Sequence, residues 1–337
     1  MTILRRRDFL KLAGAAGLSQ VVPPVLAATD MDKAAKQGKV VFYANITAVS
    51  PIMKAFQEKT GIKAEYTRTA SSKFLPTIQT EYGAGKLLAD VVQAPRPMMQ
   101  VLKDAGILAP YRSEAASDYP DWAVEDDDMT LFGVEYVSYL YNTEKVNKAD
   151  APKRYEDLAK PEWKDKIVMA DPTTHASTIS WLVGLKEQVF KSEDDWIEFL
   201  KALASNNPMF VASFGPTPAP VESGEKLLGI SMPKYIITKA PAPLDWAPQM
   251  DQPLLGTARA IAVTKSAPRP EAARAFMDYW LSADAMGLLA EDVGEYVAAP
   301  GIHPPIDGMD KTKVRPVRDL SDEEIQKWGR EFGTIFN

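Results

Sequence analysis

Short apolar runs alternate with amphipathic segments along most of this chain. The runs Lys39–Ala44, Ile62–Thr67 and Ala89–Val92 are typical of buried strands, because their apolar residues are bounded by polar or turn-forming residues. Between them lie two segments with helical patterns, one at Ile52–Thr60 and one that ends near Tyr82. Strands that alternate with helices predict a parallel sheet covered by helices.

Polar and small residues mark the ends of these predicted helices. Ser50 is a good N-cap, Pro51 suits the first helical position, and Gly61 suits the C-terminal end. The segment 69–72 caps the second helix, and Gly83–Gly85 ends it. Turns rich in hydroxyl groups therefore precede both helices.

The alternation returns in the middle of the chain. Strands are predicted at Ile167–Ala170 and Leu228–Ser231, and the turn Asp171–Thr178 opens a helix after the first of them. A strand at Ala258–Thr264 and an amphipathic helix at Pro270–Leu281 follow. This pattern predicts two α/β lobes.

The first 28 residues have the pattern of an export signal. Arg5–Lys11 is positively charged, Leu12–Leu26 is mildly apolar, and Ala27 and Ala28 offer a cleavage site. Paired arginines before Phe-Leu-Lys resemble the twin-arginine subtype. We therefore expect the leader to be cleaved near Ala27/Ala28, and the folded protein to work in the periplasm. An ordinary amphipathic N-terminal helix is the alternative.

Length and charge narrow the possible functions. About 310 residues remain after the leader, which suggests two domains. They carry 35 Lys and Arg against 44 Asp and Glu, a net charge of −9 (39 − 4 and 45 − 1). Such an acidic body argues against nucleic acid as a partner. The chain has no cysteine and only two histidines, which excludes thiolate chemistry and disfavours multi-histidine metal catalysis.

A series of short segments occurs along nearly the whole mature chain in one order. They are Val41–Ala44, Phe56–Ile62, Arg68–Ser72, Glu81–Gly85, Ala89–Val91, Tyr141–Thr143, Trp163–Ile167, Ala170–Pro172, Ser223–Glu225, Gly229–Ile230 and Ala272–Leu281. Together they resemble the periplasmic solute-binding proteins of ABC importers. The ferric-ion-binding branch is the most similar group, and its relatives also take up phosphonates, phosphorylated sugars, thiamine or polyamines.

This resemblance implies the type II periplasmic-binding-protein fold. We expect an α/β protein of two lobes, each a mostly parallel sheet flanked by helices, with two crossover segments near residues 130–140 and 248–257. Lobe 1 would comprise residues 29–134 and 251–337, and lobe 2 residues 135–250.

In open α/β sheets a ligand lies beyond the carboxyl ends of the strands. Helix N-termini and hydroxyl groups gather there, and both suit a carboxylate, a phosphate or a phosphonate. Plain helix capping is the alternative explanation for each of these residues. The candidates in the turns are Asn45, Thr47, Thr69, Ser71, Ser72, Thr174, His175 and Ser177.

The ferric branch implies two adjacent tyrosines just after the strand Leu228–Ser231. Here the positions read Pro233-Lys234-Tyr235, so one tyrosine remains and the other is lysine. A lysine would repel Fe³⁺ but would pair with an anion. We therefore predict that Lys234 and Tyr235 contact an anionic ligand, although Lys234 could instead be a surface residue. Arg68 and Arg96 also follow strands and could face the cleft.

The predicted function is the substrate-binding component of an ABC importer. It would be a monomer without enzymatic activity, cofactor or metal, which captures a small solute, an organic anion, and docks on a membrane permease. A ferric-ion transport protein, an exported enzyme and a sensor domain are the alternatives. The enzyme has little support, because the chain lacks Gly-x-Ser-x-Gly, His-Glu-x-x-His and a Gly-rich phosphate loop after the first strand.

Overall fold

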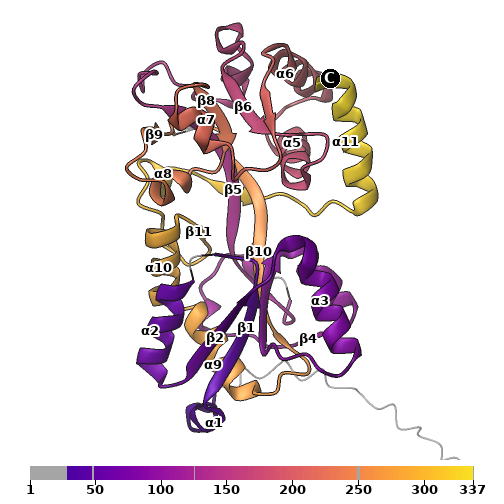
Figure 1. The fold of residues 1–337 in the computed structure, drawn as a ribbon, viewed down its shortest axis with the longest axis vertical. Helices are drawn as coiled ribbons and strands as arrows, with labels where there is room; N and C mark the ends of the chain where they lie inside the picture. Colours follow the sequence, from indigo (N-terminus) through magenta and orange to yellow (C-terminus); the bar gives the residue numbers. More distant parts are fainter. Residues whose placement is uncertain (1–28, 48, 125, 249–250, 337) are drawn as a thin grey trace, which may run out of the picture.

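Two lobes lie one above the other, and two long antiparallel strands run between them (Figure 1). The computed structural model describes residues 29–47, 49–124, 126–248 and 251–336, so the predicted leader lies outside the described residues. The two long strands are β5 (Thr130–Asn142) and β10 (Leu254–Thr264). They fall close to the two predicted crossovers, and the predicted two-lobe α/β architecture is confirmed.

Lobe 1 is built on the order β2-β1-β3-β10-β5. The first three strands are parallel, whereas β10 runs antiparallel to both β3 and β5. The strands not yet given are β1 (Lys39–Ala44), β2 (Lys63–Arg68), β3 (Val91–Pro95), β4 (Leu108–Ala109), β11 (Tyr296–Val297) and β12 (Val314–Pro316).

Lobe 2 continues the sheet from β5 in the order β8-β6-β7. Strands β8, β6 and β7 are parallel to one another, and β5 is antiparallel to β8. The strands of this lobe are β6 (Ile167–Ala170), β7 (Met209–Val211), β8 (Leu228–Ser231) and β9 (Leu244–Asp245).

Helices cover the sheets of both lobes (Figure 1). Those of lobe 1 are α1 (Met31–Gln37), α2 (Ser50–Thr60), α3 (Ser71–Gly83), α4 (Arg96–Asp104), α9 (Pro270–Trp280) and α10 (Ala283–Val293). Those of lobe 2 are α5 (Ala176–Gln188), α6 (Glu193–Ser205), α7 (Pro218–Glu222), α8 (Tyr235–Thr238) and α11 (Asp322–Phe336). Short 3₁₀ helices lie at Glu114–Ala116, Asp121–Ala123, Tyr155–Ala159, Pro161–Trp163 and Met309–Lys311.

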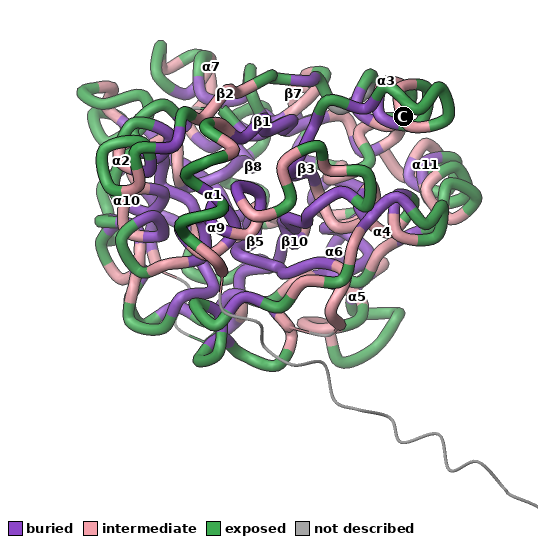
Figure 2. The backbone as a smooth tube through the Cα atoms, turned by 90° about the horizontal axis from the view of Figure 1, so that it is seen from below, coloured by how far each residue is buried: buried purple, intermediate pink, exposed green. Residues whose placement is uncertain are grey.

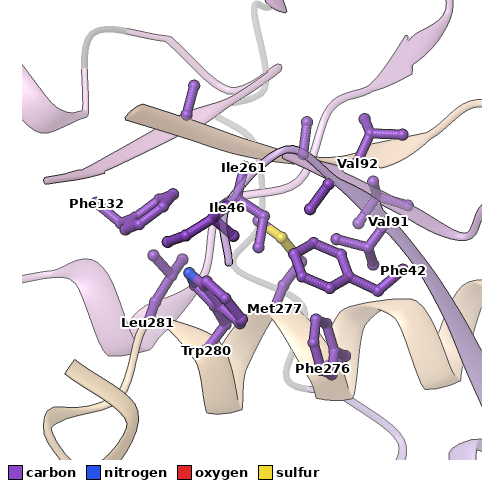
Figure 3. Close-up of a cluster of buried hydrophobic side chains, with 14 of the residues drawn as sticks. Phe42, Ile46, Val91, Val92, Phe132, Ile261, Phe276, Met277, Trp280 and Leu281 are labelled. Carbon is purple, nitrogen blue, oxygen red and sulfur yellow. The ribbon is translucent and has the colours of Figure 1, made fainter. Parts of the chain in front are cut away.

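Each lobe has its own apolar core beneath these helices. Seen from below, the buried backbone lies mainly in the strands at the centre of the view, and exposed backbone lies around them (Figure 2). In lobe 1, Phe42 of β1 packs against Phe276 and Trp280 of α9, with ring centroids 5.1 and 5.0 Å apart (Figure 3). Phe132 of β5 meets the same Trp280 edge-on at 5.6 Å. A smaller third cluster, which contains Val134, Trp246 and Leu254, joins residues of both lobes.

The C-terminal helix belongs to a different lobe from the one expected. After β12 the chain crosses between the lobes again at residues 317–321, and α11 then packs on lobe 2. The ring centroids of its Trp328 and Phe332 lie 5.7 and 6.1 Å from that of Trp196 on α6. The prediction that residues 251–337 all belong to lobe 1 is therefore wrong for α11, because its apolar face is buried against the helices of lobe 2.

Helix α1, near the start of the described chain, lies at the opposite end of the molecule from α11 (Figure 1). Thr29 donates a hydrogen bond of 2.5 Å from Oγ1 to the Asp278 carboxylate of α9, which also accepts from Tyr111 at 2.6 Å and Ser113 at 2.7 Å. The start of the described chain is thus fixed to lobe 1.

One predicted helix start is displaced, and another falls inside its predicted turn. Ser50 is the first residue of α2 and not its N-cap, which is Val49. α5 begins at Ala176, because the Asp171 carboxylate accepts hydrogen bonds from the backbone N–H and the hydroxyl of Thr173 and holds the preceding residues in a turn. His175 is therefore the N-cap of α5.

Candidate ligand-binding cleft

A cavity of about 730 Å³ lies between the two lobes. Residues that follow β1, β2 and β3 line it from lobe 1, and residues that follow β6, β7 and β8 line it from lobe 2. The parallel register aligns these strand ends, for example Ala44 beside Arg68 and Ala170 beside Val211. The cleft therefore has the position that open α/β sheets favour for a ligand.

Four charged side chains form the floor of this cleft. Arg259 of β10 lies 3.0 Å from Oε1 of Glu135 on β5 and 3.3 Å from Oε2 of Glu295, which precedes β11. Lys234, which follows β8, places its Nζ 3.1 Å from Glu295 and 3.6 Å from Glu135. The two cations and two carboxylates neutralise one another. We call this set the floor cluster.

Protonation within the floor cluster follows from these short distances. Burial works to raise the pKa of Glu135, but the charges of Arg259 and Lys234 outweigh it and lower the pKa. Burial works to lower the pKa of Lys234, but Glu295 and Glu135 raise it. Both Glu135 and Lys234 are therefore charged at neutral pH.

Lys234 consequently differs from what the sequence suggests. Its side chain is 15% exposed, so it is not a surface lysine. It lines the cleft, yet two carboxylates already neutralise its charge. The prediction that Lys234 contacts an anionic ligand did not include these partners, because Glu135 and Glu295 lie far from Lys234 in the sequence and their approach depends on the fold.

His175 lies at the opposite wall, at the start of α5. Its Nδ1 is 2.8 Å from the hydroxyl of Thr178, and its ring meets Phe214 edge-on at 4.8 Å. Burial lowers its pKa, although Glu135 and Asp171 act in the other direction. The ring is therefore neutral at pH 7. In the described part of the chain no residue forms a hydrogen bond with Nε2, which leaves this atom for a ligand.

Arg68 differs from the other arginines of the cleft. It ends β2, lines the cavity and is exposed, and no described residue forms an ion pair or hydrogen bond with it. Arg318, which also lines the cleft, pairs with Glu187 at 2.9 Å and Glu324 at 2.8 Å, and Arg96, which does not line it, pairs with Asp319 at 2.5 Å. Arg68 is thus a cation in the cleft whose charge no side chain in the described ranges neutralises.

The fold brings together most of the predicted site residues. Those that line the cleft are Asn45, Thr47, His175, Ser177, Lys234 and Tyr235. Thr69 and Thr174 do not line it: the first is buried, and the second is exposed in the turn before α5. Ser71 and Ser72 form the start of the α3 backbone.

Several lining residues were not among the predicted ligand contacts. Glu135, Arg259 and Glu295 form the floor, and the segment from Val317 to Ile325 lines one side. The sequence did mark Glu135 and Arg259 as unusual, because each is a charged residue inside an apolar strand. The C-terminal segment offered no such signal, since its position depends on tertiary packing.

The described side chains of the cleft offer little to a metal ion as the bound solute. Among the described residues no group of three or more His, Asp or Glu side chains could hold a metal ion. Tyr235 lines the cleft, but burial raises its pKa and disfavours a phenolate. The acidic side chains of the floor already bind Lys234 and Arg259.

Comparison with known proteins gives the family. The model of the bacterial extracellular solute-binding proteins matches residues 87–319, more than half of the chain. The chain belongs to this family. The prediction of a solute-binding protein, the class that serves ABC transporters, is confirmed. Members of the family are extracellular binding proteins for transport.

Individual relatives agree with this family and its fold. The iron uptake protein A1 of Synechocystis sp. (strain ATCC 27184 / PCC 6803 / Kazusa) is 25% identical over 271 residues, 73% of this chain and 71% of that protein. The substrate-binding protein of an ABC transporter from Agrobacterium tumefaciens superposes with a TM-score of 0.71 at 14% identity, covering 90% of this chain and 96% of that one. Iron-bound HitA from Pseudomonas aeruginosa gives 0.68 at 20% identity, covering 88% and 99%. No helix in the described residues is long and apolar enough to cross a membrane.

Proposed function

We propose that this solute-binding protein captures an organic anion in the cleft and delivers it to the permease of an ABC importer. The observation that carries the proposal is Arg68, a cleft cation with no partner among the described residues. A carboxylate, phosphate or phosphonate on the solute would supply the missing negative charge. Charge-assisted hydrogen bonds of this kind are the strong ones.

Hydrogen-bond donors on the opposite wall suit the same group. The first turn of α5 has no acidic residue and no side-chain cap, and its Ala176 and Ser177 line the cleft. Free backbone N–H groups and the helix dipole favour an anion there. Ser177, Ser180 and Nε2 of His175 add side-chain contacts.

The size and lining of the cleft favour an organic solute over a bare ion. About 730 Å³ is in the range of pockets that hold small organic molecules. Apolar side chains from both lobes line it beside the polar groups, including Leu75 and Met98 from lobe 1 and Phe214 and Met232 from lobe 2. Such a lining would bury the carbon skeleton of an organic anion.

Ligand binding would couple the two lobes. Arg68 belongs to lobe 1 and α5 to lobe 2, so an anion that contacts both would stabilise a closed arrangement by its higher affinity for it. The strands β5 and β10 would then act as the hinge. The closed form would present both lobes to the permease.

Iron is the second candidate, because the named Synechocystis relative is an iron uptake protein and HitA is iron-bound. Against it stand the single remaining tyrosine, Tyr235, and the neutralised carboxylates of the floor. Tyrosinate bound to Fe³⁺ gives a visible charge-transfer colour. We expect the purified protein to stay colourless with excess ferric citrate, whereas a red protein holding one tightly bound iron would favour iron transport.

Export through the twin-arginine route is part of the same proposal. Residues 1–28 would be removed near Ala27/Ala28, and the protein would act in the periplasm as a monomer. Changing Arg6 and Arg7 together to Lys should leave unprocessed precursor in the cytoplasm. Normal periplasmic levels of the double variant would contradict the twin-arginine route.

A thermal-shift screen of residues 29–337 tests the ligand class. The panel contains phosphonates, phosphate esters, mono- and dicarboxylates, aromatic acids, polyamines, thiamine and Fe³⁺. A specific ligand raises the free energy of unfolding by mass action, by about 2.7 kcal/mol at a hundred times Kd, and so raises the apparent melting temperature. We expect an organic anion to give the largest shift. A shift only with polyamines, thiamine or iron would overturn the proposal.

A further inference from the structure

The C-terminal segment forms one side of the cleft. Val317–Leu320 line it as the chain crosses between the lobes, and Asp322 and Ile325 line it from α11. The match to the family model ends at residue 319. The side chains of α11 therefore add to the cleft a wall that lies beyond the matched part of the chain.

This wall is held in place on both sides. Asp319 accepts a hydrogen bond from Arg96 at the start of α4 in lobe 1. Arg318 bridges Glu187 of α5 and Glu324 of α11 in lobe 2. Val317 donates its backbone N–H to Gly256 of β10 at 2.8 Å. The side chains that follow are therefore presented to the cleft in a defined position.

α11 also approaches the turn that carries His175. A Cβ at Gly329 would lie 2.5 Å from the carbonyl oxygen of Thr173, closer than real Cβ contacts allow. Only glycine lets the helix lie so close to this turn. Gly329 thus acts as a positioning residue that aligns the wall with the start of α5.

The chemistry of the wall is selective. Leu320 and the half-buried Ile325 offer an apolar surface. Asp322 is exposed, lines the cleft and has no ion pair with any residue in the described ranges. An apolar group on the solute would be favoured here, and a second negative charge near Asp322 would be repelled.

We infer that Leu320, Asp322 and Ile325 form the specificity-determining wall of the cleft, and that they select a monoanion with an apolar chain. This inference rests on the proposed function, since it assumes that the anionic group lies at Arg68 and α5. Ile325 would contact the apolar chain, and Asp322 would exclude solutes with an acidic group at that end.

The test uses acetate, hexanoate and adipate as probes in calorimetric titrations. Hexanoate has four more carbons than acetate, and adipate adds a second carboxylate to the same six-carbon length. We expect the wild-type protein to bind hexanoate more tightly than acetate, because each buried CH₂ contributes about 0.8 kcal/mol, a factor of roughly four. We expect it to bind hexanoate more tightly than adipate, because Asp322 would repel the second carboxylate.

Ile325→Ala should weaken hexanoate binding about tenfold and leave acetate within about twofold. Ile335→Ala is the matched control, because Ile335 lies on the same helix and packs on the same core but does not line the cleft. It should change neither affinity. Equal effects of Ile325→Ala and Ile335→Ala on hexanoate would overturn the role of Ile325.

Asp322→Asn should strengthen adipate binding roughly 2- to 5-fold and leave hexanoate unchanged, as expected for an exposed charge. Glu323→Gln is its control, because Glu323 is an exposed neighbour that does not line the cleft. Equal effects of the two variants on adipate would contradict the exclusion of a second charge.

Gly329→Ala tests the positioning role. It should lower the ratio of hexanoate to acetate affinity, because the wall would move away from the turn at Thr173. Gly287→Ala in α10, where an added Cβ meets nothing within 4 Å, should leave the ratio unchanged. A purely structural effect would lower the melting temperature without changing this ratio, and that result would overturn the positioning role.

Failure of the inference is distinguishable from failure of the proposed function. If the wild-type protein binds none of the three probes while the thermal-shift screen finds another anion, only the named solute class is overturned. If the screen finds no anion at all, the proposed function fails and the inference fails with it.

Discussion

The floor and the walls of the cleft both carry charge, but they use it differently. In the floor, Arg259 and Lys234 each lie 3.0–3.6 Å from both Glu135 and Glu295, so the opposite charges neutralise one another. On the wall of lobe 1, Arg68 has no partner among the described residues. A charged residue in a cleft is therefore informative about a ligand only after its protein partners have been counted.

Removing Arg259 should have the largest effect of all, a loss in the free energy of unfolding. Arg259→Met leaves the half-buried Glu135 and the buried Glu295 with only Lys234, and breaking a buried ion pair such as Arg259–Glu295 costs about 3–5 kcal/mol. Urea unfolding measures the loss. The control is Arg274→Met, whose ion pair with Glu271 on α9 is more exposed and should contribute about 0.2–1 kcal/mol. Similar small losses in both variants would contradict a floor cluster that stabilises the fold.

A double-mutant cycle sharpens the comparison. Lys234→Met and Glu295→Gln should each lower the free energy of unfolding by about 1.5–3 kcal/mol. Together they should cost less than the sum, because Arg259 and Glu135 remain as a neutral pair at 3.0 Å. Strict additivity would show that Lys234 and Glu295 do not interact in solution.

Removing Arg68 should instead weaken ligand binding and leave stability almost unchanged. Arg68→Ala should weaken binding of the anion found in the screen about 10- to 150-fold, since a hydrogen bond to a charged group contributes about 1.5–3 kcal/mol. Its free energy of unfolding should change by less than about 0.5 kcal/mol. Arg330→Ala is the control, because Arg330 is exposed on α11 and does not line the cleft. If Arg68→Ala binds like wild type, the proposal loses the observation that carries it.

The smallest effect concerns pH and His175. Burial lowers the pKa of this histidine in the folded protein, so below about pH 6.5, the unperturbed value, the unfolded state binds more protons than the folded state. Its contribution to stability is fully present above that pH and falls as the pH decreases toward the lowered value. The free energy of unfolding between pH 7.5 and 5.5 should therefore decline less steeply in His175→Asn than in wild type. Identical slopes would exclude a buried, neutral His175.

Much of the fold could be predicted from local patterns. The strands at Lys39–Ala44, Ile167–Ala170 and Leu228–Ser231 have the expected bounds, and the helix Pro270–Trp280 differs from its prediction by one residue. These elements have strong hydrophobic periodicity and nearby end signals, which depend only on neighbouring residues.

The floor cluster could not be predicted, because it depends on residues distant in sequence. Lys234 and Glu295 are 61 positions apart, and Arg259 and Glu135 are 124 apart. A single sequence shows that each is charged but not which charges meet. The interpretation of Lys234 as an available cation used only its place after a strand. The same limit applies to α11, whose apolar face is visible in the sequence but whose partner is set by the chain crossing at residues 317–321.

The two described ends of the chain lie on different lobes, with Thr29 held by Asp278 in lobe 1 and α11 packed on lobe 2. The molecule is therefore suited to an optical reporter of its own motion. Because the sequence has no cysteine, two introduced thiols would be the sole labelling sites. Exposed positions such as Asp32 on α1 and Gln326 on α11 could carry a donor and an acceptor dye. The energy transfer between them would then follow the angle between the lobes in real time, with no need to know the solute beforehand.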